Sequence, residues 1–272
     1  MFIAIDIGGT NGRVVPYATT SSPDGLLPPV RFKTSGDYET DLMRLFEAIE
    51  DCQVDSEDSI EAIGLGIAGA LSEDNSQVVA AGNLKHWVLR PFKNQLESQF
   101  QAPVTLGNDA YVNVLAELVY GSAPDDVLGI TWGSGLGGCH GRTPAEPGHV
   151  IVDPRADNPP CGCPRSGCLE SFVGGAKIEQ KYGVDHAGLI DQDQLTEVIE
   201  AMADGLTSVL YAHPAPLVIF AGGVANKQPG WVKRIHDRLA QDYMLDPVPE
   251  FRIATFGENT GLVGALALLA DN

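Results

Sequence analysis

Four potential metal ligands lie close together in the middle of the chain. They are His149, Cys161, Cys163 and Cys168. One imidazole and three thiolates form a common tetrahedral set for a structural zinc ion, and four protein ligands leave no open position for water. The alternative is a disulfide or inert thiols, but the two cysteines of a C-x-C pair rarely bridge each other, and a chain without a secretion signal favours metal over disulfides. We therefore predict a structural Zn²⁺ held by these four side chains.

Three short apolar runs end in glycine turns. The turns are Asp6-Ile7-Gly8-Gly9-Thr10-Asn11, Gly133 to Gly138, and Gly222-Gly223. Glycine lets backbone amides approach a phosphate or a base without a Cβ clash, and successive amides form an anion-binding concavity. One such turn is commonly only structural, but three at the carboxyl ends of predicted strands lie where α/β sheets bind ligands. The pattern predicts a nucleotide site.

Two common nucleotide motifs do not account for these turns. A P-loop needs Gly-Lys before Ser or Thr, and the chain contains no Gly-Lys pair. Gly133, Gly135 and Gly138 match the dinucleotide fingerprint GxGxxG, which must lead directly into a helix that receives the pyrophosphate. Gly141 and Pro144 follow instead and prevent such a helix. The sequence excludes a dinucleotide-binding domain on this ground.

Two aspartates follow predicted strands. Asp109 stands directly before Ala110 and an apolar helix. From spacing alone, it is either the N-cap of that helix or a general base that takes the proton of an attacking hydroxyl. Asp6 ends the first strand, and a side chain at that position commonly bonds its own backbone in the turn. The residues by themselves leave these alternatives open.

Charge and hydropathy limit the partners. The chain has 17 Lys and Arg against 36 Asp and Glu, a formal net charge of −19. A nucleic-acid surface needs clustered basic residues, and an anionic membrane is disfavoured for the same reason. No apolar run approaches the roughly 20 residues of a membrane-spanning helix, and the start MFIAIDIGGT does not resemble a signal peptide. We expect a cytoplasmic protein with neither a nucleic-acid nor a membrane partner.

Alternating strands and helices must position these groups. Strands are expected at 2–7, 14–17, 60–67, 103–106, 127–132 and 217–220, and helices around 42–49, 92–100, 112–119, 195–210 and 259–270. The apolar run 127–132 leads directly into the glycine turn 133–138, as the run 2–7 leads into Gly8 and Gly9. The class is therefore α/β, and the repeated pattern predicts two related lobes with a cleft between them.

At this point the motifs resemble those of the ROK family of sugar kinases, repressors and related proteins. The similarity follows the family's order from residue 2 to about 265. It rests on DIGGTNGR (6–13), Gly66 to Gly69, NLKHW (83–87), GNDA (107–110), Thr131 to Gly138, EPGH (146–149) and CGCPRSGCLE (161–170). The resemblance implies two ribonuclease-H-like lobes of the actin-like ATPase superfamily that close over ATP and a sugar. Residues 1–108, joined by the C-terminal helix 259–272, would form the first lobe, and residues 109–258 the second, with the zinc-binding loop.

The resemblance also implies a role for individual residues. Asp109 matches the family's catalytic aspartate and would be the general base, while Asp6 would orient Mg²⁺ through water. The other nucleotide-binding positions would be Gly8, Gly9, Thr10, Asn11, Arg13, Thr131, Gly133, Gly135, Gly222 and Gly223. The sugar-binding positions would be Gly69, Asn83, Asn108, Asp109, Glu146, His149 and Glu170. Pro147, Pro164 and Ala221 depart from the family pattern without removing a zinc ligand.

The implied activity is transfer of the γ-phosphate of ATP to the 6-hydroxyl of a hexose. Glucose is the first expectation, with N-acetylglucosamine, N-acetylmannosamine and fructose as alternatives, because these kinases share the motifs. Family repressors carry a helix-turn-helix before the first strand, and a non-catalytic sugar-binding protein would not need Asp109 and the glycine turns. Both rank below the kinase. The resemblance also implies the family's usual homodimer, but the segment between Glu170 and Leu217, which often supports dimer contacts in the family, is shorter here than usual.

Overall fold

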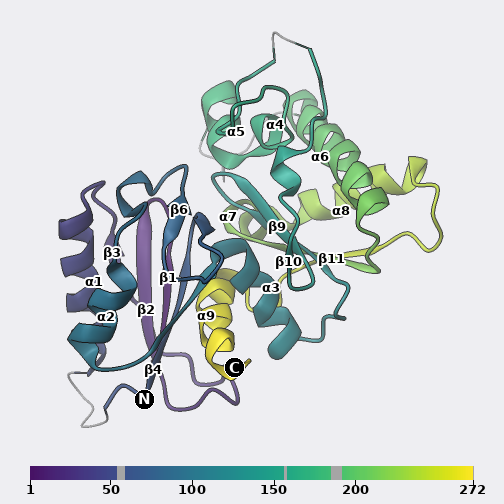
Figure 1. The fold of residues 1–272 in the computed structure, drawn as a ribbon. Helices are drawn as coiled ribbons and strands as arrows, with labels where there is room; N and C mark the ends of the chain where they lie inside the picture. Colours follow the sequence, from purple (N-terminus) through teal and green to yellow (C-terminus); the bar gives the residue numbers. More distant parts are fainter. Residues whose placement is uncertain (54–58, 156–157, 185–191, 272) are drawn as a thin grey trace. The chain divides into compact units, whose positions relative to one another are not determined.

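The computed structural model describes residues 1–53, 59–155, 158–184 and 192–271, which form two compact units (Figure 1). The first unit contains Met1–Ser122 and Asn259–Asn272, and the second contains Ala123–Glu258. The sequence placed the boundary after residue 108, whereas the structure keeps helix α3 (Asp109–Val119) with the first unit. The reason is packing, because α3 lies against α9 (Thr260–Ala270) at a glycine: a Cβ on Gly264 would lie 1.8 Å from the carbonyl oxygen of Val112.

The first unit is built on a five-stranded sheet in the order β3-β2-β1-β4-β7. The strand β2 runs antiparallel to β1 and β3, whereas β4 and β7 run parallel to β1. The strands are β1 (Phe2–Ile7), β2 (Asn11–Tyr17), β3 (Val30–Lys33), β4 (Ala62–Ile67) and β7 (Val104–Asn108). The other elements are α1 (Tyr38–Gln53), β5 (Ala70–Leu71), β6 (Val78–Ala80), η1 (Lys85–Trp87) and α2 (Phe92–Phe100).

The two faces of this sheet are covered by different helices (Figure 1). Ile3, Ile5 and Ile7 alternate along β1 and pack in one core with α1 and α2. On the other face α9 approaches the backbone closely, because a Cβ on Gly64 would lie 1.9 Å from the carbonyl oxygen of Ala265. Glycines at every second position of β4 thus admit a helix to one face while isoleucine and leucine fill the other.

The second unit repeats this plan with the order β10-β9-β8-β11-β12. Again an antiparallel meander of three strands is followed by two parallel ones. The strands are β8 (Leu128–Trp132), β9 (Leu136–His140), β10 (Thr143–Pro144), β11 (Leu217–Ala221) and β12 (Glu250–Ile253). The helices are η2 (Pro147–His149), α4 (Glu170–Val173), α5 (Gly175–Tyr182), α6 (Gln192–Ala212), α7 (Gly223–Lys227) and α8 (Pro229–Asp242), with η3 (Gly257–Asn259) at the chain's return to the first unit. The expected α/β class and the two related lobes are confirmed.

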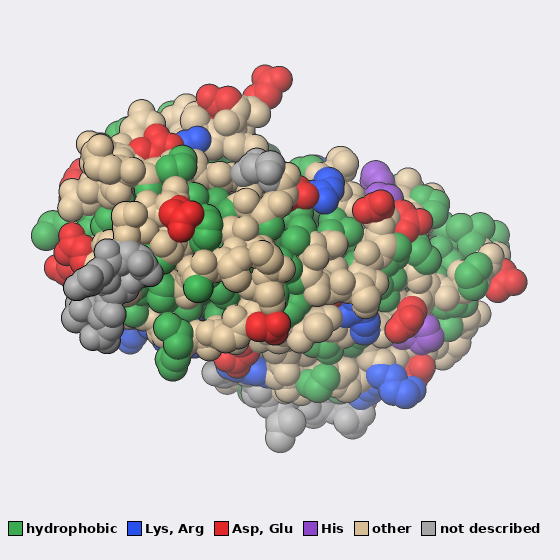
Figure 2. All heavy atoms as spheres, turned by 90° about the horizontal axis from the view of Figure 1, so that it is seen from below, with side chains coloured by type: hydrophobic (Ala, Val, Ile, Leu, Met, Phe, Trp, Pro, Cys, Tyr) green, Lys and Arg blue, Asp and Glu red, His purple; other side chains and the backbone are tan. Residues whose placement is uncertain are grey.

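The segment between Glu170 and Leu217 holds α4, α5 and α6, while residues 185–191 lie outside the described residues. Within the described part of the chain, none of the helices combines the length and the apolarity that a bilayer crossing requires. The acidic side chains are dispersed over the face drawn in Figure 2, and the fewer basic ones lie scattered among them. Acidic side chains that are spread over a face in this way keep the surface solvated and do not form one binding patch there.

Candidate active site

The carboxyl ends of three parallel strands bring the predicted residues of the first unit to one edge of its sheet. Asp6 of β1 pairs with Gly66 of β4, and Gly66 pairs with Gly107 of β7. The residues that follow Gly107 are Asn108 and Asp109. Because neighbouring strands lie about 4.8 Å apart, β1 and β7 are separated by about 10 Å at this edge. The end of β4 lies between them, so the three strand ends form one continuous edge of the sheet.

The carboxylate of Asp6 is held by a cation and by a helix end. Arg13 of β2 donates from Nε to Oδ2 of Asp6 at 3.1 Å and forms a second, shorter contact from its terminal nitrogen. Gly261, in the first turn of α9, makes room for this carboxylate, since a Cβ there would lie 2.8 Å from its Oδ2. A helix N-terminus favours negative charge. The structure therefore pairs Asp6, which the sequence analysis assigned to Mg²⁺, with Arg13, which it assigned to nucleotide binding.

The first glycine turn, at residues 8–11, is stabilised by a hydrogen bond within the turn and by two hydrogen bonds from Thr34. The amide of Gly8 donates to the carbonyl oxygen of Asn11 at 3.0 Å. Thr34 donates from Oγ1 to the carbonyl of Gly9 at 2.8 Å and from its amide to the carbonyl of Thr10 at 3.1 Å. Asn83 lies so close that a Cβ on Gly9 would stand 2.6 Å from the Asn83 Cβ. The turn needs glycine at position 9, and it contacts a predicted sugar-binding residue.

Asn108, and not Asp109, is the N-cap of α3. Its Oδ1 accepts hydrogen bonds from the amides of Ala110 at 2.9 Å and Tyr111 at 3.2 Å. Its Nδ2 donates to the carbonyl of Gly69 at 2.8 Å and to Oδ1 of Asp109 at 3.1 Å. Asp109 is thus the first residue inside the helix, half-buried, with its carboxylate oriented by the cap. The interpretation of Asp109 as the N-cap is therefore wrong, and its role as a general base stays a prediction.

In the second unit the glycine turns after β8 and β11 also share an edge. Thr131 pairs with Ala221, so Gly222 follows level with Trp132, and Gly223 follows level with Gly133. Gly222 has a φ of 98°, and a Cβ there would lie 2.5 Å from the carbonyl oxygen of Trp132. Gly223 begins α7. Position 222 therefore requires glycine, as a phosphate- or nucleoside-binding turn would.

Glu170 closes the turn between β8 and β9. Its Oε2 accepts a hydrogen bond from the amide of Leu136 at 2.9 Å. A Cβ on Gly135 would lie 2.6 Å from the same oxygen, so glycine at this position leaves the space that the carboxylate fills. The chain then continues as β9, antiparallel to β8, which confirms that no dinucleotide-binding helix follows these glycines.

Glu146 and His149 lie at the two ends of the short turn η2. Glu146 is exposed and has a left-handed backbone with a φ of 41°, and the amide of His149 donates to its carbonyl at 3.0 Å. Pro147, which departs from the family pattern, is buried in contact with Gly138, where a Cβ would lie 2.8 Å from its ring. Pro147 thus starts the turn, and its ring occupies the space that the missing Cβ of Gly138 leaves.

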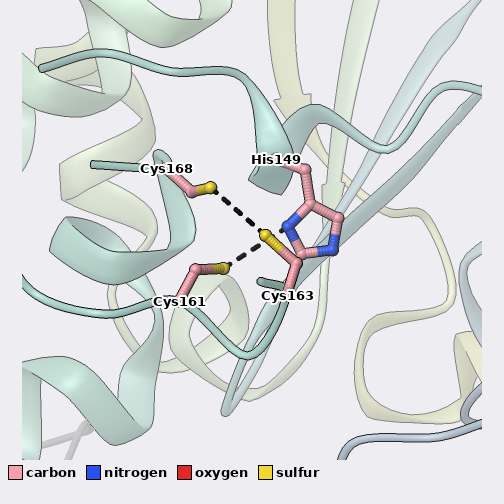
Figure 3. A group of neighbouring side chains, drawn as sticks. All are labelled: His149, Cys161, Cys163 and Cys168. Carbon is pink, nitrogen blue, oxygen red and sulfur yellow. Dashed lines mark hydrogen bonds between the residues drawn. The ribbon is translucent and has the colours of Figure 1, made fainter. Parts of the chain in front are cut away.

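The four predicted metal ligands converge (Figure 3). The donor atoms of His149, Cys161, Cys163 and Cys168 all lie within 4.8 Å of one another. The sulfurs of Cys163 and Cys168 are 3.6 Å apart, and the Cys161 sulfur is 3.5 Å from Nδ1 of His149. With Zn–S bonds of about 2.3 Å and Zn–N bonds of about 2.0 Å, tetrahedral zinc requires separations of about 3.8 and 3.5 Å. The donor set fits a structural zinc ion.

The loop that carries the cysteines is shaped for this convergence. The amide of Cys161 donates to the carbonyl of Arg165 at 3.0 Å, and Gly167 takes a φ of 74° with no room for a Cβ beside Asp153. A hydrogen bond from the backbone of Arg165 lowers the pKa of Cys163 to about 7, whereas burial raises the pKa of Cys168 to about 12. A divalent cation would favour the thiolate form of both.

Comparison with known proteins decides the family. The model of the ROK family matches residues 2–272. The chain belongs to the ROK family. A glucokinase of Halalkalibacterium halodurans is 27% identical over 97% of this chain and 93% of its own length. An N-acetyl-D-glucosamine kinase of Vibrio parahaemolyticus is 26% identical over 98% of this chain and 99% of its own.

A solved ROK structure shares the fold. The ROK family glucokinase from Streptomyces griseus, in complex with glucose and AMPPNP, superposes with a TM-score of 0.84 over 100% of this chain and 99% of that one, at 24% identity. The fold is therefore that of the ROK proteins, the actin-like fold with two lobes. The alignment with the Halalkalibacterium relative spans 311 positions, more than the 272 residues of this chain, so that relative has segments that this one lacks.

The structure gathers the predicted residues of this ROK chain within each unit. The first unit collects Asp6, Gly8, Gly9, Thr10, Asn11, Arg13, Gly69, Asn83, Asn108 and Asp109 around its sheet edge or on the turns beside it. The second collects Thr131, Gly133, Gly135, Gly222 and Gly223 at its own edge, with Glu170 against Gly135 and His149 in the metal cluster. Their roles in binding remain predictions.

Sequence reasoning missed one buried pair beside this site. Asp41 of α1 is fully buried, and its Oδ2 lies 2.8 Å from Nε2 of His86. Burial alone would raise the pKa of Asp41, but hydrogen bonds from Ser35 and His86 outweigh it and hold the pKa below its usual value. A signal was available, because Asp41 stands four residues before Leu45 on the apolar face of its helix.

Proposed function

We propose that this protein is an ATP-dependent sugar kinase that transfers the γ-phosphate to the 6-hydroxyl of a hexose, with glucose as the first substrate to test. Membership of the ROK family and the similarity to a named glucokinase over almost the whole chain support a sugar kinase. The glucokinase solved with glucose and AMPPNP supports ATP as the phosphoryl donor. Thiolates kept reduced in the cytoplasm would suit the zinc cluster.

One observation carries the assignment of the base. Asn108 supplies the cap of α3, and Asp109, the first residue of that helix, stands at the sheet edge that also holds Asp6. A carboxylate in that position is suited to accept the proton of a sugar hydroxyl. Asn108 orients it through the 3.1 Å contact and is itself tied to Gly69.

The residues of this chain would divide the reaction as follows. Asp109 would take the proton of the sugar 6-hydroxyl while the hydroxyl oxygen bonds to the γ-phosphorus of ATP. The bond between the γ-phosphorus and the oxygen that bridges it to the β-phosphate breaks, and ADP is released. The turns at Gly8–Thr10 and Gly133–Gly135 would bind phosphate oxygens through amides other than those of Gly8 and Gly133, which donate to the carbonyls of Asn11 and Gly135. Asp6 offers the hard oxygen donor that Mg²⁺ prefers, and the ion would neutralise phosphate charge.

The zinc cluster would act through structure. His149, Cys161, Cys163 and Cys168 would hold the ion, with no position left for a reacting water. Glu170 follows Cys168 by two residues and reaches the β8–β9 turn through Leu136. Fixing the cysteine loop therefore fixes Glu170, which we propose contacts the sugar together with Asn83, Glu146 and His149.

The test is ADP release from Mg-ATP over glucose, N-acetylglucosamine, N-acetylmannosamine, fructose, mannose and allose. Asp109→Asn is the matched control because it keeps the size of the side chain. We expect turnover of at least one sugar, and a loss of kcat of about 10²-fold or more in the variant. Near-normal turnover of Asp109→Asn would refute the base.

The similarity to an N-acetyl-D-glucosamine kinase favours that sugar as the second candidate. If no sugar of the panel causes ADP release but a sugar still binds, the result would favour a non-catalytic sugar-binding protein. The same preparations would test the homodimer, by light scattering coupled to size exclusion.

A further inference from the structure

A buried carboxylate in α1 serves two different loops. The side chain of Asp41 is 0% exposed. Its Oδ1 accepts hydrogen bonds from the amide of Ser35 at 2.6 Å and from the Ser35 hydroxyl at 2.7 Å, while its Oδ2 faces Nε2 of His86 at 2.8 Å. The guanidinium of Arg44 approaches Oδ1 only to 3.9 Å and is partly exposed. Since a buried carboxylate is costly without such partners, the positions of Ser35 and His86 are closely determined by it.

The Ser35 side of this pair leads to the first glycine turn. Ser35 directly follows Thr34, which donates to the carbonyls of both Gly9 and Thr10. The turn proposed to bind phosphate is therefore fastened to the segment that Asp41 holds. Only one peptide bond separates the residue that bonds the turn from the residue that bonds the carboxylate.

The His86 side leads to the loop that carries Asn83. His86 lies in η1, three residues after Asn83. The next residue, Trp87, is fully buried and meets the ring of Tyr38 edge-on, with the ring centres 5.4 Å apart. Arg90 places its guanidinium 5.0 Å from the centre of the same ring. The loop 83–90 is thus anchored on the first turn of α1.

The two loops also touch each other. Asn83 packs against Gly9, where a Cβ would lie 2.6 Å from the Asn83 Cβ. Gly9, Thr34, Ser35, Asp41, His86 and Asn83 therefore form a closed series of contacts and short chain segments. Movement of either loop away from Asp41 would change the position of Asn83 relative to the turn.

We propose that Asp41 and His86 are positioning residues that set Asn83 for sugar binding against the phosphate-binding turn. Neither touches the substrates; each acts through a loop that does. The proposal rests on the proposed function, because it takes Asn83 as a sugar ligand.

The kinetic test is His86→Ala, with His86→Gln as the conservative variant. Alanine removes the contact with Asp41 and releases the loop 83–90, while the turn stays bonded to Thr34. We expect the KM for the sugar to rise about tenfold or more, as for misplacement of a binding group, with the KM for ATP changed by less than about twofold. Glutamine offers a donor near the position of Nε2 and should restore most of the sugar KM.

Asp37→Ala is the control for simple destabilisation. The Asp37 side chain caps α1 through the amide of Thr40 at 3.0 Å and its hydroxyl at 2.7 Å. Its loss should lower Tm as loss of a helix cap does, yet leave the sugar KM within about twofold. An equal rise of the sugar KM in Asp37→Ala and His86→Ala, or no rise in His86→Ala, would overturn the proposal.

A second readout does not depend on catalysis. The amides of Trp87 and Leu89 are bonded to the carbonyls of Leu84 and Val78, at 2.9 and 2.8 Å. His86→Ala should speed hydrogen exchange at these two amides, whereas Asp37→Ala should not. If the wild-type protein binds and phosphorylates no sugar, the proposed function fails by itself, while unchanged exchange in His86→Ala would show that the pair does not position the loop.

Discussion

Gly135→Ala should lower the stability of the second unit. The added Cβ would stand 2.6 Å from Oε2 of Glu170, closer than real Cβ contacts allow. The carboxylate must move, and the hydrogen bond that it accepts from the amide of Leu136 at 2.9 Å is broken or lengthened. The φ of Gly135 lies outside the left-handed region, so alanine meets no backbone penalty of that kind.

The size of the effect follows from that one bond. A hydrogen bond to a charged group contributes about 1.5–3 kcal/mol. In a chain of this length, each kcal/mol shifts Tm by about 2–4 °C, so complete loss of the bond would lower Tm by about 3–12 °C. That is the largest fall we expect, because Oε2 is the end of a flexible side chain that can move aside. Differential scanning calorimetry with zinc supplied in excess measures the shift, and metal analysis shows whether the cysteine loop has kept its ion.

Gly133→Ala is the matched control, two residues earlier in the same turn. A Cβ there meets no atom of the described residues within 4 Å, apart from its chain neighbours. We expect its Tm to stay within about 2 °C of wild type, since surface changes alter stability by less than about 0.5 kcal/mol. If the turn binds phosphate, Gly133→Ala should still raise the KM for ATP. A Tm of Gly135→Ala equal to that of Gly133→Ala would refute the packing argument for Glu170.

Two further predictions concern the metal cluster and the buried carboxylate. Cys163→Ser should lose zinc and lower both Tm and sugar affinity, because structural zinc binding is coupled to folding; a zinc-free variant with the Tm and sugar KM of wild type would contradict this. The lowered pKa of Asp41 means that its contribution to stability is complete above the unfolded value of about 3.9 and is lost as the pH falls further. The Tm difference between wild type and Asp41→Asn should thus shrink as the pH falls from 4 to 3, as measured by scanning fluorimetry; a difference that stays the same over that range would rule it out.

Local patterns allowed much of the fold to be predicted. The strands that end in glycine turns and the helix at residues 192–212 appear near their expected positions, because period-two and period-3.6 patterns are written within one segment. Helix α8 was missed although Trp231, Val232, Ile235 and Leu239 carry its apolar face after Pro229. These four residues recur at helical spacing, so the sequence contains the signal for this helix.

The metal cluster and the glycine positions were determined by the sequence. Four soft or borderline ligands within one short segment need only a local loop to converge, and the distances between their donor atoms agree with zinc. Glycine likewise permits a close approach, which the structure shows at Gly9 and Gly222. The chain cannot show in advance which atom will make that approach.

Only the tertiary structure determined which polar side chain caps a helix and which distant side chain a buried carboxylate contacts. Asn108 and Asp109 are equally good cap residues by type, and a shift of one residue in the start of α3 separates the cap from the candidate base. Asp41 and His86 are 45 residues apart, and their contact exists because α1 and η1 pack in the same core. The chemistry of a side chain is a property of its type, but its partner is set by the packing of the whole unit.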